Sequence, residues 1–166
     1  MKIAASIEFM CSLAAREAIA AEYKEIEPEH LLAAILKFSE LPVAELEKMA
    51  PGAHVARELA HDVEAARREL SDRAIDSTGV RRELRSAMGS GSCKYGGGVI
   101  HRSSASREVF DRAARLADDT GSESLSPIHV LEVILASPSP TMEKTLGEAV
   151  GPRIPRATET PLLAEF

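Results

Sequence analysis

The strongest constraint on the fold is a proline–histidine–leucine signature that occurs twice. The first copy begins at Pro28 and reads Pro-Glu-His-Leu-Leu-Ala-Ala-Ile-Leu; the second begins at Pro127, ninety-nine residues later, and reads Pro-Ile-His-Val-Leu-Glu-Val-Ile-Leu. The match continues upstream without a gap, and the pairs that share this spacing include Ala14 with Ala113, Ala18 with Ala117 and Ile26 with Leu125. A unit that cannot bury its apolar face alone gains a partner by duplication. We therefore expect two helical units related by a pseudo-two-fold axis and packed on each other.

The fold class predicted from the pattern is all-α, a duplicated helical repeat in one domain. Apolar residues recur every three or four positions, as at Ile3, Ile7 and Met10. Aromatic residues make up only 4% of the chain, so the core must come mainly from Ala, Leu, Ile and Val. The predicted helices are about 3–23, one from 28, 42–50, a long one carrying 55–70, one from 103 or 104 to 119, one from 127, and 141–150. Residues 78–88 are predicted as a further helix, or as a continuation of the long one after a break near Gly79.

The predicted domain organisation follows from the same signals. Repeat one takes about 1–88, a flexible Gly/Ser connector about 89–101 and repeat two about 102–150, giving a double-repeat domain over 1–150. Repeat two is the shorter, since it lacks a clear long fourth helix. Three prolines and no helical period predict an extended tail over 151–166.

Charge and hydropathy exclude several classes of partner. The net charge of −6 argues against a general nucleic-acid binder, which would need a basic face. No stretch approaches about 18 uninterrupted apolar residues, and Glu8 interrupts the apolar start, so we expect no membrane span and no signal peptide. These features predict a cytoplasmic protein.

The sequence shows no catalytic or metal-binding constellation. Cys11 and Cys93 have no CxxC spacing, and a buried thiol and an incidental loop thiol explain them better than a disulfide or a metal site. His54 and His61 lack a third ligand with suitable spacing. His30 and the equivalent His of the second copy fit a structural hydrogen bond repeated by duplication better than a catalytic role. The glycine run over 89–98 is not a phosphate loop, because no Gly-Lys-Ser/Thr ends it.

Two features of the chain resemble the N-terminal repeat domain of the Clp-type AAA+ unfoldases. One is the repeated Ala-x-x-x-Ala followed by Pro-x-His-Leu/Val-Leu; the other is the final Thr-Pro-Leu-Leu-Ala-Glu-Phe at 160–166, similar to the linker before the first ATPase module of that family. The resemblance implies an all-helical domain that binds protein substrates or adaptors and presents them to a hexameric ring. It further implies that 151–166 is the linker to such a ring.

The resemblance also sets the expected cofactors and partners. This chain has no Walker motif and should not hydrolyse ATP, so ATP and magnesium are expected only for the full-length protein. The expected partners are unfolded or tagged protein substrates and adaptor proteins. The full-length protein is expected to be a homo-hexamer, which in some relatives works with a peptidase.

Four site residues follow from the same resemblance. In ClpC-like relatives each half forms a phosphoarginine pocket from the Glu of the Glu-His-Leu-Leu motif and a Thr near the start of the first helix. Here Glu29 matches the carboxylate, and the Thr position falls on about Ala4. In the second half Ser103 keeps the polar position and Ile128 replaces the acid, so each half keeps one of the two groups. We also expect an apolar groove lined by the first helices of both halves, with Glu29 at one rim.

Two other function classes remain open. A free-standing Clp-repeat protein could act as an adaptor or regulator, but it has no reason to end in a linker-like segment. An unrelated helical enzyme would need a polar pocket with perturbed titratable groups, for which the sequence gives no sign.

Overall fold

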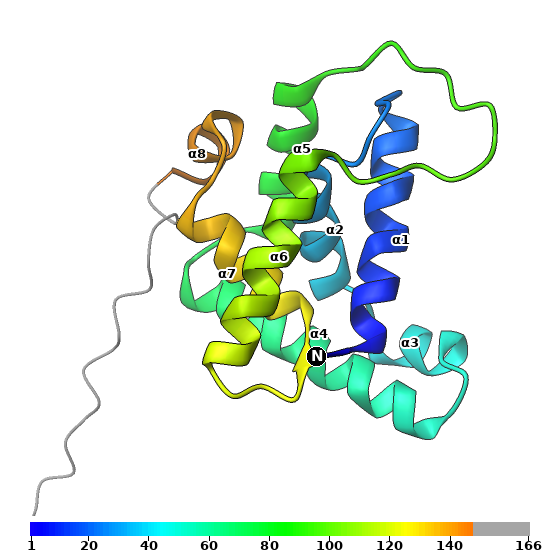
Figure 1. Ribbon diagram of the computed structural model, residues 1–166, viewed down its shortest axis with the longest axis vertical. Coiled ribbons are helices and arrows are strands. Elements are labelled where there is room, and N and C mark those ends of the chain that lie inside the picture. The colour runs from blue at the N-terminus through cyan, green and yellow to red at the C-terminus, as the bar shows by residue number, and fades with distance from the viewer. Residues whose placement is uncertain (148–166) are drawn as a thin grey trace, which may run out of the picture.

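The computed structural model describes residues 1–147, and these residues form the predicted all-helical fold (Figure 1). The predicted linker over 151–166 and the predicted end of the last helix near Val150 lie outside the described residues. The elements are β1 Lys2–Ile3, α1 Ala5–Ala20, α2 Pro28–Ser39, α3 Val43–Met49, α4 Ala53–Asp72, α5 Ser77–Met88, α6 Ser104–Asp119, β2 Ser124–Leu125, α7 Pro127–Ala136 and α8 Pro140–Leu146.

The two halves are joined by reciprocal strand contacts. Ile3 of β1 pairs in parallel with Leu125 of β2, and Ile26 forms an isolated parallel bridge with Arg102. Adding the repeat spacing of 99 to Ile3 gives Arg102, and adding it to Ile26 gives Leu125. Each half therefore contributes the same two positions to the other half. Two copies related by translation could not exchange these contacts, so the halves are related by a pseudo-two-fold axis, as predicted.

The core lies where α2 and α7, the second helices of the two repeats, meet. Figure 1 shows α2 between α1 and α6, and α2 contacts α1, α4, α5, α6 and α7. The repeated proline begins both helices, where its missing N–H costs no hydrogen bond. Most of their large buried side chains are aliphatic: Leu31, Leu32, Ile35 and Leu36 from α2, and Val130, Leu131, Ile134 and Leu135 from α7. Large aliphatic side chains therefore supply most of the apolar burial, as the low aromatic content requires.

The first helix is shorter than predicted, because it ends at Ala20 rather than near Tyr23. Glu22 adopts a left-handed conformation with φ 59°, and the Tyr23 N–H donates back to the Ala18 carbonyl at 2.9 Å. The second repeat ends its first helix in the same way, with Gly121 at φ 71°. The prediction extended past this helix end because it rested on apolar periodicity, which carries no information on a left-handed backbone conformation at a non-glycine residue.

Helix α5 occupies the place that the symmetry would give to a fourth helix of repeat two. In repeat one, α4 contacts α3 of its own half and α7 of the other half. Helix α5 makes the corresponding two contacts. It contacts α8, the counterpart of α3 in repeat two, and it contacts α2 of repeat one. A helix that precedes repeat two in the chain thus covers it. The predicted repeat boundaries remain predictions, since α5 contacts both halves.

The connector after α5 is fastened to the end of α1 before it returns to α6 (Figure 1). The Gly91 N–H donates to the Ala21 carbonyl at 2.7 Å, and the Cys93 N–H donates to the Glu22 carbonyl at 2.9 Å. A Cβ at Gly91 would lie 2.3 Å from the Glu22 oxygen, so only glycine allows this approach. The expected flexible connector therefore begins with an anchored segment. Within residues 1–147, no helix has the length and apolar character needed to cross a membrane.

Candidate functional site

The four predicted site residues lie on both sides of the seam between the halves. Ala4 is buried directly before α1, and its N–H donates to the Leu125 carbonyl at 3.0 Å. By the same symmetry Ser103 is the buried N-cap of α6, and its N–H donates to the Ile26 carbonyl at 3.0 Å. Glu29 and Ile128 occupy the first turns of α2 and α7.

The polar groups kept by the two halves belong to the same side of this seam. Ser103 lies against Ile26, which leads into the helix that carries Glu29. Ser106 strengthens the contact, because its hydroxyl donates to the same Ile26 carbonyl at 2.6 Å. Sequence comparison within each half associates Glu29 with Ala4, whereas the strand exchange brings the start of α6 to the start of α2. Ser103 and Glu29 thus lie on one side of the seam, and Ala4 and Ile128 lie on the other.

Next to the polar side is a hollow of about 220 Å³ between α6, α7 and α8, which we name the α6–α8 hollow. Its polar edge includes Ser139, the N-cap of α8, whose hydroxyl donates to Glu29 Oε1 at 2.7 Å. The Arg112 guanidinium crosses another part of the edge and donates to Ser137 Oγ at 3.2 Å. The walls are apolar and come from Val109, Ile134, Pro138 and Met142.

The α6–α8 hollow exists because repeat two lacks an aromatic pair that repeat one has. In repeat one, Phe9 and Phe38 pack against each other with ring centroids 6.1 Å apart, and Phe38 is fully buried. The residues ninety-nine positions later are Glu108 and Ser137, which both line the hollow. Two large rings are thus replaced by a carboxylate and a hydroxyl, and the space they would fill is open. Such a site can take an apolar side chain while its polar edge binds the neighbouring backbone.

The α6–α8 hollow is not the expected groove between the first helices of both halves, which stays a prediction. The hollow uses the first helix of repeat two, α6, but its contribution from repeat one is Pro28 at the start of α2. Sequence reasoning missed Glu108 and Ser137. The signal was present in the repeat alignment, as two aromatic positions that change to polar ones.

The groups considered for chemistry remain apart. Within residues 1–147 no three His, Cys, Asp or Glu side chains are grouped so that they could hold a metal ion. Cys11 and Cys93 are both free thiols, and burial raises the pKa of Cys11, which Arg102 opposes in part. The His61 Nδ1 atom lies 3.4 Å from a carboxylate oxygen of the adjacent Asp62 and is otherwise exposed.

Comparison with known proteins supports the fold at the level of structure. The sequence matches no family model and no curated protein. Among solved structures, the chain is similar to the N-terminal domain of Hsp104 from Candida albicans, with a TM-score of 0.60 and 13% sequence identity. The similarity covers 90% of this chain and 82% of the Hsp104 domain. The chain therefore has a fold like that of a Clp-type N-terminal domain.

Proposed function

We propose that this chain is a substrate- or adaptor-binding domain of a Clp-type protein unfoldase. The observation that carries the proposal is the α6–α8 hollow, an apolar-walled and polar-edged site at the seam of a fold like the Hsp104 N-terminal domain. Unfolded segments expose apolar side chains next to unpaired backbone groups. A hollow with both kinds of surface suits such a ligand.

In this proposal the binding residues have distinct roles. Val109 and Met142 form the wall for the client's apolar side chain, and Glu29, held at the edge by Ser139, is the polar contact. Ser103 supports this side of the seam as the buried N-cap of α6. Ala4 and Ile128 hold the corresponding positions on the other side. The domain itself carries out no reaction.

The wider setting is part of the proposal. The domain acts in the cytoplasm and delivers clients to a homo-hexameric ring, which binds ATP and magnesium outside this chain. The segment 151–166 is the tether that keeps the client near the ring and raises its effective concentration there. A free-standing adaptor with the same fold is the alternative, and the coding sequence beyond Phe166 separates the two.

The test fills the hollow with the side chains that repeat one has. The double variant Glu108→Phe/Ser137→Phe restores the aromatic pair, and its binding to reduced, alkylated lysozyme, a basic protein that cannot refold, is measured by fluorescence anisotropy. We expect at least about a tenfold loss of affinity, because a buried apolar side chain contributes about 1.5–3 kcal/mol. The control is Arg115→Ala, an exposed change on the same helix. Unchanged binding by the filled variant, or no binding by the wild type, would refute the proposal.

A further inference from the structure

The α6–α8 hollow has a filled counterpart in repeat one, which shows what kind of side chain its place accommodates. Three of its lining residues have counterparts in repeat one that are at most 5% exposed. These are Val109, Arg112 and Ile134, which correspond to Met10, Leu13 and Ile35. In repeat one the fully buried ring of Phe38 belongs to the same core cluster and packs on Phe9 at an interplanar angle of 52°. Phenylalanine is therefore the residue that closes this place in the filled half.

Repeat two does not close the place with a residue of its own second helix. Helix α2 continues through Phe38 to Ser39, whereas α7 ends at Ala136. The next residue, Ser137, has left the helical conformation with φ −139° and ψ 64°, and Pro138 has no N–H group to continue the helix. The helix therefore stops before the position of Phe38, and a small hydroxyl side chain stands at the position of the ring.

The size and the walls of the α6–α8 hollow suit one large, flat side chain. Its volume of about 220 Å³ is several times the roughly 30 Å³ that one water molecule occupies in the liquid. Pro28, Val109 and Pro138 are half-buried and offer apolar surface to a ligand. Ile134 and Met142, each 1% exposed, close the floor beneath them. An apolar ring that enters this space therefore packs against apolar atoms on several sides.

Arg112 brings a cation to the edge of the same space. Its guanidinium donates to Ser137 Oγ at 3.2 Å and forms no ion pair within the described part of the chain. A planar guanidinium is attracted to the face of an aromatic ring, whereas it gains nothing of the kind from an aliphatic side chain. The chain contains such a contact elsewhere, because the Arg102 guanidinium lies over the Phe110 ring at 4.4 Å from its centroid. Arg112 thus favours an aromatic ligand over an aliphatic one of the same size.

The acidic groups at the edge do not select a side chain. Glu108 is an exposed carboxylate that lines the hollow, and Glu29 accepts the Ser139 hydroxyl at 2.7 Å. Ionised carboxylates only accept hydrogen bonds, so they suit backbone N–H groups, which every unfolded segment carries. The choice among client segments therefore depends on the side chain that enters the hollow.

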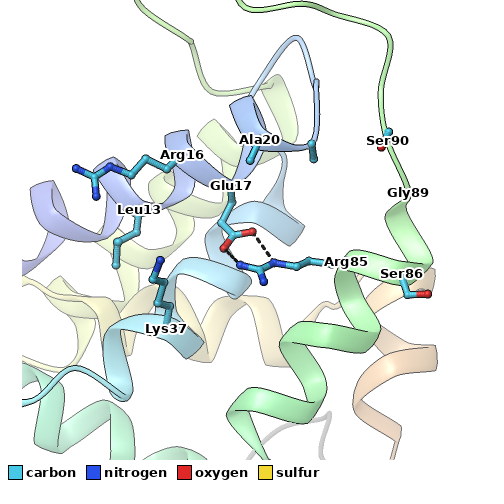
Figure 2. Close-up of a pocket in the computed structure, with 10 residues that line it drawn as sticks. Leu13, Arg16, Glu17, Ala20, Lys37, Arg85, Ser86, Gly89 and Ser90 are labelled. Atoms are coloured by element: carbon cyan, nitrogen blue, oxygen red, sulfur yellow. Dashed lines mark hydrogen bonds and ion pairs between the residues drawn. The ribbon is translucent and has the colours of Figure 1, made fainter.

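A second hollow, of about 450 Å³ between α1, α2 and α5, is larger but does not offer the same surface. Figure 2 shows Glu17 and Arg85 facing each other across it, joined by two hydrogen bonds, of which the one from Arg85 Nε is 3.0 Å long. Leu13 is the one large apolar side chain among the described residues that line it, and it is only 5% exposed. A ring that entered this second hollow would meet mainly charged and small residues.

We infer that the α6–α8 hollow binds the ring of a phenylalanine side chain of the client, with Arg112 against one face of the ring and Glu108 accepting a neighbouring backbone N–H. The ligand supplies from another chain the aromatic group that Phe38 supplies within repeat one. This inference deepens the proposed function, on which it rests for the source of the segment. It makes Arg112 a residue that determines specificity, because it separates aromatic from aliphatic side chains.

The first experiment titrates the whole chain with uncharged ligands that differ only in their side chain, the N-acetyl amides of phenylalanine, cyclohexylalanine and leucine. Cyclohexylalanine has nearly the size of phenylalanine but no aromatic face. The methyl NMR signal of Met142, at the floor of the hollow, gives each dissociation constant, and Met49, exposed on α3, is the control for non-specific contact.

We expect the phenylalanine amide to bind about two- to fivefold more tightly than the cyclohexylalanine amide, the range of an exposed cation–π contact. The leucine amide, which buries less apolar surface, should bind more weakly than either. Equal affinities for phenylalanine and cyclohexylalanine would overturn the inference. Absence of a Met142 response to the phenylalanine amide would overturn it as well.

The second experiment repeats the titrations with variants of the edge. Arg112→Gln keeps a hydrogen-bond donor for Ser137 but removes the charge, so the affinity ratio of phenylalanine to cyclohexylalanine should fall to about one. Arg115→Gln, an exposed change on the same helix, should leave the ratio unchanged. The filled variant Glu108→Phe/Ser137→Phe should lose the response to all three amides. A ratio unchanged by Arg112→Gln would contradict the inference, as would a response that persists in the filled variant.

The outcomes distinguish this inference from the proposed function. If reduced, alkylated lysozyme binds at the α6–α8 hollow but the phenylalanine amide shows no preference over cyclohexylalanine, the inference fails and the proposed function stands. If the phenylalanine amide binds with the expected preference and lysozyme does not bind, the site is confirmed and the proposed function fails.

Discussion

At the scale of the residue, the two repeated histidines have the same structural role on one side of the ring. Both accept the backbone N–H at the start of their helix through Nδ1. Burial lowers the pKa of both, although Glu29 opposes this for His30 and Glu132 opposes it for His129. A neutral imidazole is therefore part of each helix start.

The pH dependence of stability follows from these lowered pKa values. In the unfolded chain a histidine binds a proton below about pH 6.5, whereas the folded state resists protonation until a lower pH. The unfolded state thus binds more protons in this window, so the free energy of unfolding should fall as pH drops from about 6.5 towards the folded pKa values. Urea unfolding measured at about pH 7.5, 6.5, 5.5 and 5.0 gives the size of this loss.

The control for this prediction is the double variant His30→Gln/His129→Gln. Glutamine at this position can still reach the backbone N–H that precedes the helix, but it does not titrate. We expect a smaller loss of stability over the same pH range. An identical pH profile for the variant would show that other groups cause the loss.

The repeated histidine was predicted from the sequence as a structural hydrogen bond, and the Nδ1 bonds fit that expectation. The surroundings of Nε2 differ between the repeats, because His129 Nε2 meets the Ser122 hydroxyl at 3.1 Å, whereas the Tyr23 ring packs on the His30 ring with centroids 4.8 Å apart. This difference could not be predicted, because it depends on where Tyr23 points. Its hydroxyl is drawn to Met88 of α5, a helix that lies 65 residues further along the chain. Periodicity places a side chain on a face of its helix, but it does not choose a distant partner.

At the scale of the element, the position at the end of the second helix of each repeat contributes differently to stability in the two halves. Phe38 is fully buried at the end of α2 and packs on Phe9, whereas Ser137 is exposed at the edge of the α6–α8 hollow. We expect Phe38→Ala to lower the free energy of unfolding by about 3–5 kcal/mol, since the core loses a large ring. Ser137→Ala should change it by less than about 0.5 kcal/mol. Urea denaturation of both variants measures the difference, and similar losses would contradict this account of the hollow.

The helix boundaries show which element properties are readable from sequence. The proline starts of α2 and α7 were predicted correctly, because proline at the first helical position has a local cause. The end of α1 was predicted three residues too late, because a left-handed Glu22 carries no such signal. The packing of α5 against repeat two could not be predicted from the sequence for a different reason. Its place beside α2 and α8 depends on the symmetry of the whole fold.

At the scale of the whole molecule, the reciprocal contacts make each half depend on the other. Each half contributes a strand residue and a helix start to its partner, and α2 contacts α6 and α7 across the seam. The duplication in the sequence predicted this mutual packing, but the exchange of strands at the seam is a property of the three-dimensional arrangement. It decides which site residues become neighbours.

This dependence predicts one cooperative unfolding transition for the two repeats. Circular dichroism at 222 nm, the usual helix band, and fluorescence of a dye on Cys93 should give the same urea midpoint if the transition is two-state. Separate fragments 1–92 and 96–166 should be largely unfolded alone, because each loses the apolar partner that completes its core. Mixed in equal amounts, they should regain helical signal, since the break falls in the exposed part of the connector. A cooperative transition in fragment 1–92 alone would show that repeat one, with α4 and α5 around it, already forms a complete core.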